Sequence, residues 1–146
     1  TRWTDNDMYG HVNNTRYHEF FDVCVNDFLI QRCGLDPAAA VSADRAERAQ
    51  GLIGFVAHNA IDYLHPVAYP QRLYAKLRIA RIGRTSATYQ LALFAGPRGQ
   101  DPATFPDDEW VCAALGTYVH VYVNAETHQP QALPRAYTAA MQALMA

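Results

Sequence analysis

The feature that most limits the possible folds is a single long amphipathic segment followed mainly by extended ones. Residues 14–32 carry apolar side chains at every third or fourth position, which is the spacing of one helical face: Tyr17, Phe20, Phe21, Cys24, Val25, Phe28 and Leu29. Asn13 or Asn14 suits the N-terminal cap, and Cys33 with Gly34 suits the end. The pattern therefore predicts one long helix with an aromatic buried side.

Four extended segments follow this helix. Residues 35–51 predict a loop and a short helix, and a short helical tail begins near Arg135. Between them, segments that are rich in Val, Ile, Tyr and Thr, or that alternate, predict strands at residues 52–64, 72–82, 85–95 and 110–123. The loop at residues 96–109, with its prolines and acidic residues, is expected to be the most mobile segment.

These elements predict an α+β fold in which a curved antiparallel sheet of about five strands wraps one central helix. A chain of 146 residues, half of them apolar, is long enough for one domain and too short for two ordinary ones, so residues 1–146 are expected to form one domain. The chain begins at Thr1 in an apparently extended segment, and part of a first strand is expected to be missing. The open edges of such a sheet favour pairing of two chains.

Charge and cysteine content exclude several classes of function. With 12 basic and 14 acidic residues, the net charge of −2 makes no case for nucleic acid or an anionic membrane as partner. The three cysteines form no CxxC pair, so neither a disulfide framework nor a zinc site is indicated, and a reducing cytoplasm fits best. No apolar run approaches the length of a membrane-spanning helix, and no leader precedes the first motif.

The stretch TDNDMYGHVNN, residues 4–14, concentrates polar residues just before the predicted helix. Asp, Gly and Asn all favour turns, so an ordinary loop is one interpretation of this cluster. The other is a site, because a carboxylate just before a helix start lies close to the oriented amides and the positive dipole end of that helix.

Residues 2–7, 9–14 and Tyr17 closely resemble the opening signature of the hotdog-fold acyl-CoA thioesterases of the 4-hydroxybenzoyl-CoA thioesterase type. The resemblance continues more loosely through residues 61–67 and 81–86, and to Pro130 and residues 133–134, so it covers essentially the whole chain. It implies a hotdog fold and hydrolysis of an acyl-CoA thioester. The order of elements agrees with the periodicity described above.

The resemblance implies that Asp7 is the catalytic carboxylate, which attacks the thioester carbonyl or activates a water that does so. Gly10 would let the backbone approach the substrate without a side chain in the way. His11 would either polarise the carbonyl or make an orienting hydrogen bond. Asp5 is expected to be structural and to fix the loop through hydrogen bonds to backbone amides.

Six further residues are candidates for substrate binding. Asn13 either donates to substrate or caps the helix, and Tyr17 is expected in the core with its hydroxyl at the pocket wall. Asn59 alternates with His58 along a strand, and periodicity does not decide which side lines a groove. In the turn RIGRTS, Arg84 is either a contact for the coenzyme A phosphates or an ordinary surface arginine, and Thr85 and Ser86 would add hydroxyl contacts.

The sequence therefore predicts a cytoplasmic acyl-CoA thioesterase that releases a carboxylic acid and free coenzyme A, with no metal or cofactor, as a homodimer or homotetramer. Two alternatives remain. One is a hotdog hydratase or dehydratase that uses Asp7 with His11 on an acyl-CoA, and the other is a non-catalytic acyl-CoA-binding dimer. The aromatic residues of the helix and first strand suit an aryl or a fatty acyl group equally well.

Overall fold

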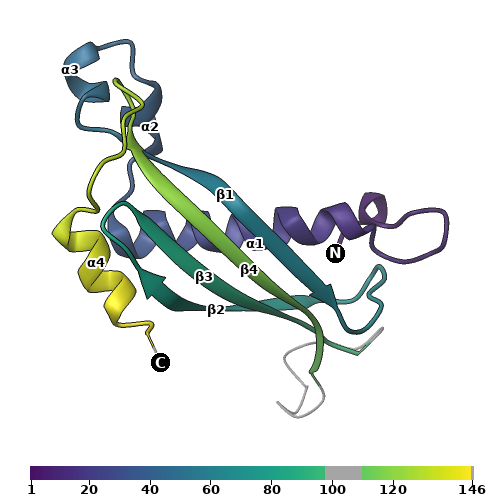
Figure 1. Cartoon of the computed structure of the whole chain (residues 1–146). Coiled ribbons are helices and arrows are strands. Elements are labelled where there is room, and N and C mark those ends of the chain that lie inside the picture. Colours follow the sequence, from purple (N-terminus) through teal and green to yellow (C-terminus); the bar gives the residue numbers. More distant parts are fainter. Residues whose placement is uncertain (98–109, 146) are drawn as a thin grey trace. The chain divides into compact units, whose positions relative to one another are not determined.

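The computed structural model describes residues 1–97 and 110–145, and Figure 1 shows their elements in chain order. Five helices and four strands carry the labels used below: α1 (Asn14–Phe28), η2 (Leu29–Cys33), α2 (Pro37–Val41), α3 (Arg45–Arg48), β1 (Leu52–Tyr63), β2 (Leu73–Ile82), β3 (Ser86–Ala95), β4 (Val111–Asn124) and α4 (Arg135–Gln142). A short 3₁₀ turn, η1 (Trp3–Asp5), precedes them. The predicted helix, four strands and helical tail are confirmed to within a residue or two at most ends.

The long helix has the ends that its sequence predicts. Asn13 Oδ1 accepts a hydrogen bond from the Thr15 backbone N–H at 3.0 Å, which is the N-terminal cap. The last turn, η2, is a π-helical turn, and the helix stops at Gly34, whose φ of 76° is left-handed and favours glycine. Segment 35–51 contains two short helices, α2 and α3, where one was expected.

One antiparallel sheet has the strand order β1-β4-β3-β2. The described residues thus hold four strands where about five were predicted. The N-terminal segment expected to be extended turns instead at Trp3–Asp5, because the Asp5 carboxylate accepts the Arg2 backbone N–H at 2.6 Å and closes the turn. Its extended part is reduced to one bridge between Asn6 and Val12.

Burial along the strands distinguishes the middle of the sheet from its edge. In β3 every second residue is buried, so one face packs on the core, as the alternation predicts: Ala87, Tyr89, Leu91, Leu93 and Ala95. In β1, by contrast, residues 55–60 are exposed on both faces. Alternation of buried and less buried residues therefore describes β3, but it does not account for residues 55–60 of β1, which are exposed on both faces.

The contacts divide the chain into two compact units. The first unit comprises Thr1–Cys24, Ile61–Leu77 and Leu91–Gly116, and the second comprises Val25–Ala60, Arg78–Gln90 and Thr117–Ala146. Helix α1 and all four strands contribute residues to both units. The prediction of one domain over residues 1–146 stays a prediction, and the loop predicted to be mobile lies outside the described residues at positions 98–109.

Close packing of Gly116 against Phe21 in the first unit carries a prediction about stability. A Cβ at position 116 would lie 2.7 Å from Phe21 Cε2, and the Phe21 ring is fully buried. Gly116→Ala is therefore expected to lower the free energy of unfolding by about 1–3 kcal/mol through overpacking, measured by urea denaturation. Leu115→Ala, at an exposed neighbour, is the control, and equal stability of the Gly116 variant and the wild type would contradict the packing argument.

Candidate active site

A tight loop precedes the long helix and holds the three predicted catalytic residues, Asp7, Gly10 and His11. The bridge between Asn6 and Val12 closes it, the Asp7 N–H donates to the His11 carbonyl at 2.9 Å, and the Gly10 N–H donates to the Asp7 carbonyl at 3.1 Å. Gly10 has a φ of 77°, a conformation that side chains rarely adopt. The glycine is therefore needed by the turn itself, whatever its role toward a substrate.

The Asp7 carboxylate lies half-buried within this loop. Its Oδ1 accepts the Tyr9 backbone N–H at 2.9 Å, which is the geometry of an Asx turn. This is what the ordinary-loop interpretation predicts. The same bond also orients the carboxylate. The turn uses only Oδ1, so Oδ2 has no part in holding the turn.

Asp5 lies just before the loop, and only 1% of this residue is exposed. Oδ1 accepts from the Arg2 side chain at 3.1 and 3.2 Å and lies 3.8 Å from Arg16 Nε. Burial opposes ionisation of Asp5, but the hydrogen bonds from Arg2 and the charges of Arg2 and Arg16 outweigh it and hold the pKa of Asp5 below its usual value. These contacts support the structural role that was predicted.

Backbone hydrogen bonds tie the loop to the helix start and to the segment after β1. The Asn13 N–H donates to the Asp5 carbonyl at 2.8 Å, and the Val12 N–H donates to the Val67 carbonyl at 2.7 Å. The Tyr69 N–H donates to Asn6 Oδ1 at 3.0 Å. The loop is thus held on both sides, and its geometry does not depend on a substrate.

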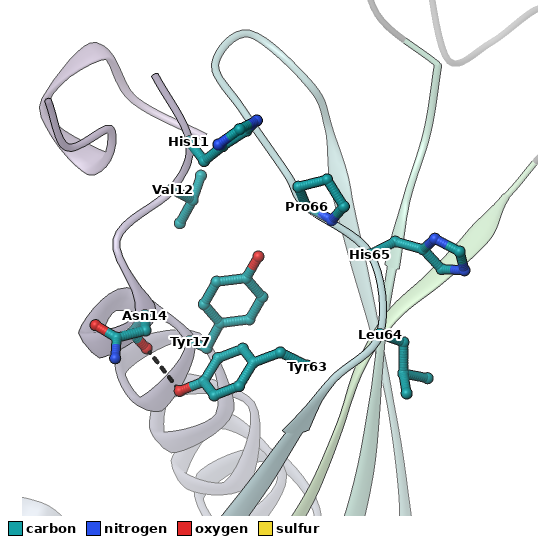
Figure 2. A pocket seen from close by; sticks show the side chains of 8 residues that line it. All are labelled: His11, Val12, Asn14, Tyr17, Tyr63, Leu64, His65 and Pro66. Carbon is teal, nitrogen blue, oxygen red and sulfur yellow. Dashed lines mark hydrogen bonds between the residues drawn. The ribbon is translucent and has the colours of Figure 1, made fainter. Parts of the chain in front are cut away.

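A hollow of about 290 Å³ opens beside the loop, as Figure 2 shows. Its lining comes from the loop, from α1 and from the end of β1: His11, Val12, Asn14, Tyr17, Tyr63, Leu64, His65 and Pro66. Asp7 adjoins this lining through its backbone hydrogen bond to His11. The hollow therefore lies beside the loop that carries Asp7, although Asp7 itself is not among its lining residues.

Two tyrosines form the aromatic wall of the hollow. Their rings pack edge to face with centroids 5.1 Å apart, and the Tyr63 hydroxyl donates to the Asn14 carbonyl at 3.2 Å (Figure 2). The Tyr17 ring is buried and its hydroxyl points toward the end of the hollow formed by His11 and Pro66. Burial raises the pKa of Tyr17, against the effect of the Val67 backbone hydrogen bond, so its hydroxyl is neutral near neutral pH.

The other predicted binding residues belong to the second unit. Asn59 is exposed on β1, and Arg84 is exposed in the turn between β2 and β3. Backbone contacts fix this turn: the Arg84 carbonyl accepts the Leu133 N–H at 2.9 Å, and the Thr85 carbonyl accepts the Tyr122 N–H at 2.8 Å. Ser86 closes it by accepting the Gly83 N–H at 2.8 Å.

Six of the eight residues that line the hollow were not among the predicted site residues: Val12, Asn14, Tyr63, Leu64, His65 and Pro66. His65 and Pro66 follow directly after β1, and Pro66 lies in the region that carries the looser part of the family resemblance. A proline just past a strand with a histidine before it is a weak signal, since such residues are common in turns. Their position beside Tyr17 depends on partners far apart in the sequence, such as the Val12 N–H that donates to the Val67 carbonyl.

The described part of the chain carries no group of three His, Cys, Asp or Glu side chains placed to hold a metal ion. Across residues 1–97 and 110–145, no helix has the length and apolar character needed to cross a bilayer. Cys24, Cys33 and Cys112 form no disulfide with one another.

Comparison with protein families gives a match over nearly the whole chain. Residues 1–143 match the thioesterase-like superfamily. Among curated proteins, no match to the sequence was found.

Several crystal structures share the fold. A protein of Pseudomonas aeruginosa strain PAO1 is 40% identical, with 100% of this chain and 87% of that chain covered and a TM-score of 0.78. A candidate thioesterase of Pseudomonas aeruginosa is 25% identical, with 97% and 92% covered and a TM-score of 0.74. The DHNA-CoA thioesterase of Staphylococcus aureus is 19% identical, with 99% and 87% covered and a TM-score of 0.69, and supports the predicted hotdog fold alone.

Proposed function

The chain belongs to the thioesterase-like superfamily, and from this premise we propose that it hydrolyses acyl-CoA thioesters to a carboxylic acid and free coenzyme A. The observation that carries the proposal is the oriented Asp7 carboxylate, in a loop that leads into α1 and adjoins a hollow with an aromatic wall. Thioester hydrolysis needs a nucleophile or base on one side of the carbonyl and donors for the developing oxyanion. The N-terminal signature further favours the 4-hydroxybenzoyl-CoA thioesterase type within the superfamily.

In this proposal Asp7 attacks the carbonyl or activates water, and the positive dipole end of α1 stabilises the oxyanion. Gly10 keeps the loop in the conformation that presents Asp7. His11 lines the hollow and orients the thioester. Asn13 acts first as the helix cap, which the hydrogen bonds from Thr15 to its side chain support, and Tyr17 forms the pocket wall.

Coenzyme A brings phosphate groups, for which we propose contacts from Arg84, Thr85 and Ser86 in the second unit. The exposed guanidinium of Arg84 on a turn fixed by backbone hydrogen bonds supports this assignment. Asn59 is proposed as a further substrate contact from the exposed face of β1. A reducing, cytoplasmic location is also proposed, from a sequence with three cysteines and no CxxC pair.

We also propose that two chains pair through β1. This strand lies at the edge of the sheet, is twelve residues long and exposes Phe55 and Val56 at 52% and 43%. A long apolar edge strand exposed to water is a site of strand pairing. Sedimentation equilibrium is expected to give a mass of twice 16.3 kDa or, for a pair of dimers, four times that mass. A monomer at micromolar concentration would contradict the pairing.

The direct test of the function is release of free thiol from a panel of short, medium, long and aryl acyl-CoA esters. Release by the wild type is expected for at least one class of ester. Binding without thiol release would instead favour an acyl-CoA-binding module, or a hydratase, which leaves the thioester intact. Absence of both binding and release would reject the acyl-CoA proposal.

A further inference from the structure

A second hollow of about 330 Å³ lies in the same unit as the first. It shares two lining residues with the first hollow, His65 and Pro66. Its remaining wall includes Ala95 at the end of β3, Pro97 just after it, and Val111 at the start of β4. The segment His65–Pro66 therefore lies between the two hollows. Figure 2 shows the His65 ring pointing away from Tyr17 and Tyr63.

The one amide side chain in the lining of the second hollow is already bonded to the protein. Gln71 Oε1 accepts the Ala68 N–H at 2.9 Å, and Gln71 Nε2 donates to the Gly96 carbonyl at 2.8 Å. These bonds use one N–H and one lone pair of the amide, so covering this side chain with an apolar ligand costs less than covering an unbonded amide. Four of the seven lining residues have apolar side chains, namely Pro66, Ala95, Pro97 and Val111, and these give a hydrocarbon chain a surface to pack against beside the polar His65 and Gln71.

At the crossing between the two hollows, the backbone N–H groups of residues 64–66 are either bonded to the protein or absent. Pro66 has no backbone N–H, and the His65 N–H donates to the Ala113 carbonyl at 3.1 Å. The Leu64 N–H donates to the same carbonyl at 2.8 Å. These bonds to β4 hold the segment in place, so the crossing is part of the rigid fold.

We infer that the second hollow holds the distal part of the acyl chain, so that Val111 and Ala95 set how strongly longer acyl groups are preferred over short ones. The inference rests on the proposed acyl-CoA substrate. A short acyl group fills the first hollow, between Tyr17, Tyr63 and Val12. A longer one crosses over Pro66 and buries its end against Val111, whose side chain is 47% exposed.

The test uses non-hydrolysable S-alkyl coenzyme A thioethers with butyl, octyl and dodecyl chains, and measures their binding by calorimetry. Because each buried methylene favours binding, the wild type is expected to bind the octyl compound at least about tenfold more tightly than the butyl compound. Val111→Trp fills the second hollow and is expected to abolish this difference, while butyl binding changes by less than about twofold. Val111→Ala enlarges it and is expected to shift the preference toward dodecyl.

Leu115→Trp is the matched control, since Leu115 is on the same strand, is 44% exposed and is not among the residues that line either hollow. It is expected to keep the wild-type dependence on chain length. An unchanged dependence in both Val111 variants, or equal affinity of the wild type for all three chains, would overturn the inference. Normal dependence on chain length without thiol release from the esters would refute only the proposed hydrolysis, and failure of all three compounds to bind would overturn both.

Discussion

Asp7→Asn is expected to lower kcat for thioester hydrolysis by about two to four orders of magnitude. Asparagine retains the side-chain oxygen that accepts the Tyr9 N–H, so the Asx turn and the loop geometry survive. It lacks the second carboxylate oxygen and the negative charge, so it neither attacks a carbonyl nor takes a proton from water. The measurement is thiol release at saturating acyl-CoA, together with circular dichroism and thermal unfolding of the variant.

Two further variants make this experiment specific. Asp7→Ala removes both the charge and the hydrogen bond from the Tyr9 N–H. If only Asp7→Ala, and not Asp7→Asn, unfolds at a lower temperature, the hydrogen bond stabilises the loop and the charge acts in the chemistry. Asp27→Asn removes an exposed carboxylate on α1 and is expected to leave turnover unchanged. Full activity of Asp7→Asn would show that Asp7 is only a turn residue, as its hydrogen bond by itself would suggest.

Asp5→Asn is expected to lower the free energy of unfolding by about 3 kcal/mol, although Asp5 takes no part in the proposed chemistry. The carboxylate accepts three hydrogen bonds from Arg2 and lies next to Arg16, while it is nearly inaccessible to water. In asparagine, one carboxylate oxygen is replaced by an NH₂ group, which would face the N–H donors of Arg2 and accept none of their hydrogen bonds. Asparagine also carries no charge to balance the two arginines. Urea denaturation at neutral pH measures the loss.

The same carboxylate makes this part of the stability depend on pH. Because the pKa of Asp5 is lower in the folded protein than in the unfolded chain, its contribution is fully present above the unfolded value of about 3.9. It is lost as pH falls through the folded pKa. The difference in stability between wild type and Asp5→Asn is therefore expected to be constant near neutral pH and to shrink in strong acid.

Glu19→Gln is the matched control for Asp5. Glu19 forms ion pairs with the same two arginines, at 3.1 Å to Arg2 and 2.8 Å to Arg16, but its side chain is 43% exposed. Water screens such surface pairs, so the effect of this variant on stability is expected to be small. Equal losses in the two variants would show that burial of Asp5 is not what makes its contacts strong.

Local chemistry made much of the fold predictable. The spacing of Tyr17, Phe21, Val25 and Phe28 predicted the long helix, and all four are buried. The caps at Asn13 and Gly34 were predictable because they depend on neighbouring backbone groups alone. The loop from Asp7 to Gly10 was predictable as well, because its hydrogen bonds join residues that are close together in the sequence.

What only the tertiary structure decided involves partners that are distant in the sequence. The bond from Arg2 that closes the turn at Asp5 is local, but the burial of Asp5 beside Arg16 of α1 comes from the fold. The strand order β1-β4-β3-β2 leaves β1 at the edge, which periodicity does not reveal. His65 and Pro66 come to line two hollows because backbone bonds to Ala113 hold this segment against β4. The sequence by itself determined the elements and the loop, since their spacing, caps and turns depend on adjacent residues. The lining of the site required the fold, since it arises from side chains that only long-range packing brings together.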